Sequence, residues 1–124
     1  MNDDQRWLMP PAELAAVILP FFSSWEPRAE SEVRKNIVAW LSGQTDKQLG
    51  HVSYFSARKV FENPAVRAVG EALQHLERAC LLMRAIDGGQ YGGCYVGITR
   101  LGMHALATNT VRQHLGLGDA PPAT

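Results

Sequence analysis

The stretch from residue 72 to residue 106 constrains the fold of this chain more than any other, because its helix and strand signals follow in a defined order. Just before this stretch and in its first part, apolar side chains recur at the three- and four-residue spacing of one helix face: Val66, Val69, Leu73, Leu76 and Cys80. The pair Asn63-Pro64 predicts where this helix starts, since Asn accepts hydrogen bonds from free backbone N–H groups and Pro fits the first turn.

Two short apolar runs follow this helix and predict a β-hairpin. They span residues 81–86 and 94–98, and the Gly-rich residues 87–93 separate them. Thr99 then predicts the N-cap of a further helix, which we expect to cover residues 100–116 as one continuous element. The predicted order is therefore helix, strand, turn, strand, helix.

The first third of the chain predicts two more helices. Residues 11–19 form a short apolar segment that we expect to be a helix closed by Pro20. A linker over 23–27 leads to an amphipathic pattern over 28–41, which predicts a second helix ending at Gly43.

Residues 69–106 also match a known family pattern on both sides of the hairpin. The matching positions are Ala72, Leu73, Leu76, Glu77, Leu81, Leu82, Tyr95, Ile98, Thr99, Gly102, Ala105 and Leu106. This segment, about a third of the chain, resembles the one shared by winged helix-turn-helix regulators of the MarR and PadR type. The chain departs from the pattern at Cys80, where the family usually has Gly, and at Gly97. Such a resemblance supports the fold directly and the function only by association.

The resemblance implies a mainly α protein with a small β-hairpin (α+β), a winged helix-turn-helix with extra N- and C-terminal helices. Residues 1–27 would form an N-terminal arm with a short helix, and residues 28–99 the winged helix-turn-helix core. The C-terminal helix over 100–116 precedes a tail, 117–124, that we expect to be disordered. The stretch 53–62 is longer than a usual turn, and we expect there either a continuation of the preceding helix or a separate short helix.

In that family the helix before the hairpin is the one laid in the DNA groove. The resemblance thus implies a transcriptional regulator of double-stranded DNA, with Arg67 and Gln74 reaching base edges. Other candidate DNA contacts are Lys47, Arg58 and Lys59 toward phosphates, and Gln90 and Tyr91 in the wing.

The charge of the chain favours a different use of the same fold. Lys and Arg number 12, as do Asp and Glu, so the chain has no net basic charge to attract DNA. The wing, residues 87–93, contains no Lys or Arg, although a wing that approaches phosphates usually carries a cation. The alternative is therefore a winged-helix protein-interaction module, or adaptor, that binds no DNA.

The terminal helices suggest a homodimer, since two half-sites on DNA call for two-fold symmetry. The N-terminal apolar residues are Trp7, Leu8, Phe21, Phe22 and Trp25, and they would pack either on the chain's own core or against a second subunit. A small-molecule effector held between the dimer helices and the core is a further expectation. Its lining would include Trp25, Trp40 or Tyr54.

The sequence carries no enzymatic motif. The histidines, His51, His75, His104 and His114, lack the spacing of metal ligands, and no nucleophile elbow or phosphate-binding loop is present. We therefore expect no enzyme, metal or cofactor. No apolar run is long enough to span a bilayer, and the acidic N-terminus is unlike a signal peptide. Two cysteines without CxxC spacing are typical of a reducing compartment, so we expect a cytoplasmic protein.

Overall fold

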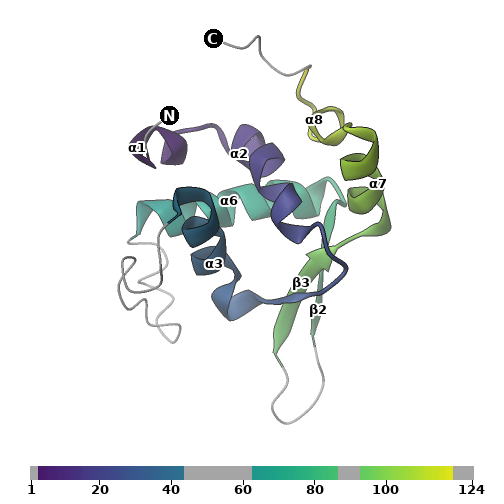
Figure 1. The fold of residues 1–124 in the computed structure, drawn as a ribbon, viewed down its shortest axis with the longest axis horizontal. Helices are drawn as coiled ribbons and strands as arrows, with labels where there is room; N and C mark the ends of the chain where they lie inside the picture. Colours follow the sequence, from purple (N-terminus) through teal and green to yellow (C-terminus); the bar gives the residue numbers. More distant parts are fainter. Residues whose placement is uncertain (1–2, 44–62, 87–92, 119–124) are drawn as a thin grey trace.

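Helices surround one end of a small antiparallel sheet, and the β-hairpin extends away from them (Figure 1). The computed structural model describes residues 3–43, 63–86 and 93–118. Its elements are α1 (Asp3–Trp7), α2 (Pro11–Ile18), the 3-10 helix η1 (Leu19–Phe22), β1 (Arg28–Ala29), α3 (Glu30–Ser42), α6 (Pro64–Arg78), β2 (Leu82–Ile86), β3 (Cys94–Ile98), α7 (Arg100–Thr108) and α8 (Val111–His114). The chain is thus mainly helical with a three-stranded sheet, which confirms the predicted α+β class.

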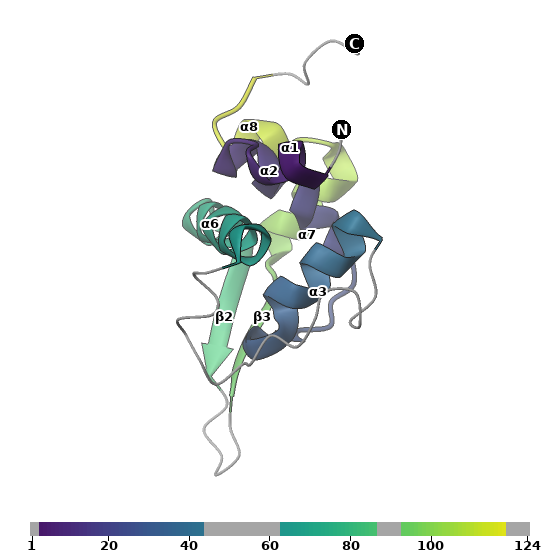
Figure 2. The same cartoon turned by 90° about the vertical axis from the view of Figure 1, so that its left-hand side faces the viewer.

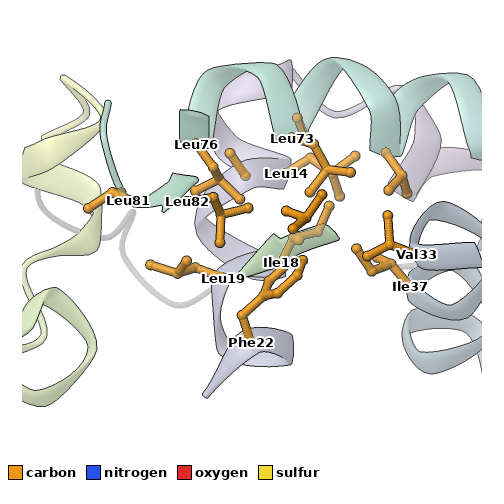
Figure 3. Close-up of a cluster of buried hydrophobic side chains, with 14 of the residues drawn as sticks. Leu14, Ile18, Leu19, Phe22, Val33, Ile37, Leu73, Leu76, Leu81 and Leu82 are labelled. Carbon is orange, nitrogen blue, oxygen red and sulfur yellow. The ribbon is translucent and has the colours of Figure 1, made fainter. Parts of the chain in front are cut away.

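Helix α6 begins as predicted and forms the centre of the packing. The side chain of Asn63 accepts hydrogen bonds from the backbone N–H groups of Ala65 and Val66, at 2.9 and 3.2 Å. The apolar face of α6 packs against α2 and α3, and Val33 and Ile37 of α3 face the same core (Figure 3). Buried side chains from these elements and the hairpin include Leu14, Ile18, Leu19, Phe22, Val33, Ile37, Leu73, Leu76, Leu81 and Leu82.

The sheet contains a strand that the sequence did not predict. Its order is β1-β3-β2, with β3 antiparallel to both neighbours. The prediction of a helix from Arg28 was wrong for its first two residues, since Arg28 and Ala29 pair with β3 and α3 starts at Glu30. A strand of two residues has no periodicity of its own, and only its partner β3 defines it. Gly43 ends α3 with a left-handed φ of 70°, as predicted.

The C-terminal segment also differs from the prediction of one helix over 100–116. It breaks into α7 and α8 at Asn109, whose φ is 56°. The N–H groups of Asn109 and Thr110 bond back to the carbonyls of Leu106 and Ala105, at 3.3 and 2.9 Å, which completes a Schellman motif. Asn tolerates the left-handed conformation better than most residues. The turn at Asn109 therefore ends α7, although the apolar spacing continues as in a single helix.

Pro20 does not end the first helical run. The α-helical part, α2, finishes at Ile18, and the chain continues through Pro20 as the 3-10 helix η1 up to Phe22. The helical segment predicted within 53–62 and the tail residues 119–124 lie outside the described residues.

The apolar residues named for the N-terminal arm differ in how far they are buried in their own chain. Phe22 is buried, and Trp7 and Phe21 pack partly buried against the core. Leu8 and Trp25 remain 83% and 63% exposed. Trp7, Phe21 and Phe22 therefore pack on the core of their own chain, whereas Leu8 and Trp25 stay on the surface.

A Schellman motif joins α6 to the hairpin. Cys80 has a φ of 64°, and its N–H bonds to the Glu77 carbonyl at 3.0 Å. The N–H of Leu81 reaches the Leu76 carbonyl at 2.9 Å, and both of these leucines are buried. Cys80 thus occupies the left-handed position at which Gly is the usual residue.

Thr99 and Gly102 fasten the start of α7 onto this same turn. The Thr99 N–H bonds to the Leu81 carbonyl at 3.0 Å, and its hydroxyl donates to the Cys80 carbonyl at 2.7 Å while accepting from the Gly102 N–H at 2.9 Å. A Cβ on Gly102 would lie 2.3 Å from the Leu81 carbonyl oxygen, so only glycine fits. We call Leu76, Cys80, Leu81, Thr99 and Gly102 the α6–hairpin junction.

Candidate nucleic-acid interface

The exposed face of α6 is polar. Arg67, Glu71, Gln74 and Arg78 are exposed at spacings of four, three and four residues, while the opposite face of the helix is buried. This spacing places the four side chains in one stripe along the helix. Both base-reading residues predicted from the sequence, Arg67 and Gln74, lie in this stripe, and His75 beside it is half-buried.

A groove of about 420 Å³ runs along this stripe where α3, α6 and β2 meet. Its lining residues are Glu30, Arg34, Val66, Arg67, Gly70, Glu71, Gln74 and Arg84. In Figure 2, α6 lies at the upper end of β2, and α3 packs against α6 and runs down beside the strands. We call this hollow the α3–α6 groove; it contains the predicted residues Arg67 and Gln74 together with charged side chains from two other elements.

Ion pairs connect the three elements of the groove. One carboxylate oxygen of Glu30 accepts from Nη1 of Arg34 at 3.0 Å and lies 2.9 Å from Nη1 of Arg84. The Nε–H of Arg84 donates to the carboxylate of Glu77. A single arginine on β2 therefore bridges a glutamate on α3 and a glutamate on α6.

These contacts change the acidity of the groups involved. Partial burial raises the pKa of Glu30, but the hydrogen bonds from Arg34 and Arg84 outweigh it and leave the pKa below its ordinary value. Burial likewise lowers the pKa of Arg84, and the carboxylates of Glu77 and Glu30 reverse this and raise it overall. Both groups are thus held in their charged forms at neutral pH.

Sequence reasoning missed Glu30 and Arg34 as members of this groove. Their spacing of four residues was a signal for a pair on one helix face. Nothing in the sequence, however, indicates that β2 would bring Arg84 to the same carboxylate, since that contact depends on how the hairpin packs beside α3.

The remaining predicted DNA contacts cannot be placed. Lys47, Arg58 and Lys59, together with Gln90 and Tyr91 of the wing, lie outside the described residues. They stay predictions from the sequence alone.

Two smaller hollows lie elsewhere on the molecule. One, of about 360 Å³, is formed by α2, α7 and α8, and the other, of about 310 Å³, lies between the ends of α6 and α8. Neither is lined by Trp25 or Trp40, the residues predicted for an effector site, and Tyr54 is outside the described residues. Trp40 instead contacts the ring of Phe21, with centroids 5.4 Å apart.

Within residues 3–43, 63–86 and 93–118, no group of three or more His, Cys, Asp or Glu side chains is arranged to hold a metal ion. None of the helices in the same ranges combines the length and the apolar character that crossing a membrane requires. Comparisons with protein-family models, with curated proteins and with solved structures found no match to this chain.

Proposed function

We propose that this protein is a DNA-binding transcriptional regulator of the winged-helix type. From α2 to β3 its described elements follow the order helix, 3-10 helix, short strand, helix, helix and hairpin, and the short strand pairs with the last strand of the hairpin. That order and pairing support a winged helix-turn-helix, in which α6 is the recognition helix and β2–β3 the wing.

The exposed polar stripe of α6 carries the proposal. Core packing accounts for the buried face of this helix, and Arg67 and Gln74 share the other face, which borders a groove. Arg pairs bidentately with guanine and Gln with adenine in the major groove of DNA. A helix that directly precedes a wing and presents both is suited to reading base edges.

Fluorescence anisotropy with a labelled mixed-sequence duplex, at low and then moderate salt, tests the proposal. We expect wild type to bind at low salt and to weaken steeply as salt rises, because phosphate contacts release counterions. The double variant Arg67→Ala/Gln74→Ala removes the two proposed base-reading side chains of the stripe and is expected to bind at least tenfold more weakly. Arg100→Ala is the control, since it removes the same charge from α7, which does not line the α3–α6 groove. Absence of wild-type binding even at low salt would overturn the proposal.

A homodimer in the cytoplasm and a small-molecule effector complete the proposed regulator. The terminal elements α1, α2, α7 and α8 gather at the end opposite the hairpin, where Leu8 and Val17 are exposed, and this end is available for pairing (Figure 1). The hollow formed by α2, α7 and α8 offers a small molecule a place close to that end. Sedimentation velocity tests the dimer, which a monomer at micromolar concentration would contradict.

One observation favours a protein-interaction module as the second candidate. The hairpin exposes Met83, Ile86 and Tyr95, at 55%, 83% and 37% of their surfaces. Apolar side chains on a wing suit a protein surface better than a phosphate backbone. The same anisotropy titration separates the two candidates, because this module would not bind the duplex at any salt concentration.

A further inference from the structure

Two arginines of the α3–α6 groove converge on a single oxygen atom. Nη1 of Arg34 and Nη1 of Arg84 lie 3.0 and 2.9 Å from the same Oε1 of Glu30. Arg34 comes from the middle of α3 and Arg84 from β2, so the fold, and not chain proximity alone, brings the guanidinium groups together. The position of this oxygen is one where an anion receives charge-assisted hydrogen bonds from two directions.

The same position borders the proposed DNA-reading stripe. Arg34, Arg84, Arg67 and Gln74 line one groove with Glu30. A duplex that places base edges against α6 also brings its backbone phosphates close to the elements on either side of that helix. A phosphate oxygen is the type of acceptor that paired guanidinium groups bind best.

We propose that Arg34 and Arg84 form a phosphate-binding site, and that the carboxylate of Glu30 occupies this site intramolecularly until a DNA phosphate displaces it. The identification of the phosphate as one of duplex DNA rests on the proposed function; the anion site itself does not. Glu30 then acts as a built-in competitor, which weakens binding to any duplex that does not also make favourable base contacts.

The charge balance of the groove agrees with this role. The groove lining and Glu77 together place Arg34, Arg67 and Arg84 against Glu30, Glu71 and Glu77, so the charges cancel. Displacing Glu30 toward solvent leaves its two arginine partners for the phosphate. A chain with no net charge can by this means bind a polyanion at one place while attracting it little elsewhere.

Glu30→Gln tests the site, because it removes the competing charge and keeps the size of the side chain. A matched control is Glu32→Gln, since Glu32 is exposed and lies in the same acidic first turn of α3. Both variants change the net charge by the same amount and remove a similar interaction with the helix dipole. Of these two glutamates, Glu30 is the one that contacts Arg34 and Arg84 in the described pairs.

In the DNA measurement, Glu30→Gln is expected to bind a mixed-sequence duplex roughly tenfold more tightly than wild type, as for one added charge-assisted hydrogen bond. The slope of log K against log salt should steepen by about one, because one more phosphate is neutralised. Adding Arg34→Ala to Glu30→Gln should abolish the gain. Equal affinities for wild type, Glu30→Gln and Glu32→Gln would overturn the site and leave the proposed function standing.

A second measurement uses inorganic phosphate and needs no DNA. Titrating phosphate into each protein and recording the arginine Nε–H resonances should shift the signals of Arg34 and Arg84 in Glu30→Gln, and much less in wild type and Glu32→Gln. Phosphate binding by Glu30→Gln without DNA binding by any variant would support the anion site and overturn the proposed function. If phosphate moves neither signal in Glu30→Gln, the anion site is wrong.

Discussion

Two regions hold α6 to the β-hairpin, and they do so through different kinds of interaction. The α6–hairpin junction consists of backbone hydrogen bonds, one threonine hydroxyl and a glycine packed against a carbonyl. The α3–α6 groove consists of charged side chains, and Arg84 reaches both Glu30 and Glu77 across it. The first region is close-packed backbone, whereas the second is a hollow of about 420 Å³.

This difference indicates that the junction fixes the position of α6, whereas the groove can exchange its ion pairs for contacts with a ligand. The junction residues carry no charged side chain, so we expect their packing to depend little on salt. Ion pairs between partly exposed side chains contribute little stability, are screened by salt and exchange readily for another partner. A ligand can therefore rearrange the groove without disturbing the junction that positions α6.

Gly102→Ala should break the junction and give the largest effect. The added methyl group would lie 2.3 Å from the Leu81 carbonyl oxygen and 2.7 Å from a side-chain carbon of Ile98, so backbone must move. We expect a loss of about 3 kcal/mol in the free energy of unfolding, measured by urea denaturation. Gly93→Ala is the control, because a Cβ there meets no atom within 4 Å. Equal stabilities of the two variants would contradict this description of the junction.

Arg84→Met should weaken the groove by a smaller amount. It keeps the apolar stem of the side chain and removes the contacts with Glu30 and Glu77. Because these side chains are 25–37% exposed, we expect a loss of about 1 kcal/mol at low salt. The loss should shrink in 1 M NaCl, where such pairs are screened. A loss that is independent of salt would mean that Arg84 acts by packing.

Cys80→Gly should strengthen the junction slightly. The φ of 64° at Cys80 costs energy for a residue with a Cβ and nothing for glycine. Glycine also gains freedom in the unfolded chain, which offsets part of the benefit, so we expect a net gain of about 0.5 kcal/mol. Thermal denaturation of the reduced proteins measures it. A loss of stability would show that the Cys80 side chain contributes packing that outweighs the strained backbone.

The pH dependence of the groove should be the smallest effect. The pKa of Glu30 lies below its ordinary value in the folded chain, so its contribution is fully present above the unfolded pKa near 4.3 and is lost as pH falls through the folded pKa. The stability difference between wild type and Glu30→Gln should therefore be constant from pH 6 to 8 and shrink toward pH 3. Urea denaturation of both proteins from pH 3 to 8 measures this difference in stability. A difference that grows on acidification would contradict the prediction.

The sequence predicted the parts of the fold that local rules determine. Asn63 and Thr99 cap their helices as expected, and the two hairpin strands fall on their apolar runs. The two-residue strand β1 exists only through pairing with β3, and the break at Asn109 depends on one residue's left-handed conformation. Neither leaves a periodic signal.

The candidate site likewise has a part that local sequence patterns predict and a part that depends on tertiary packing. The stripe of Arg67 and Gln74 follows from helical spacing and was predicted. The convergence of Arg34 and Arg84 on Glu30 depends on the approach of β2 to α3, which no short-range pattern in the sequence encodes.

The most direct test of the central claim, that the α3–α6 groove binds DNA, is an amide chemical-shift titration of wild type with a duplex. We expect shifts at Arg67, Gly70 and Gln74 of α6 and at Arg34 of α3, and none in α8, which does not line the groove. Shifts confined to α7 and α8, or no shifts at low salt, would contradict the account.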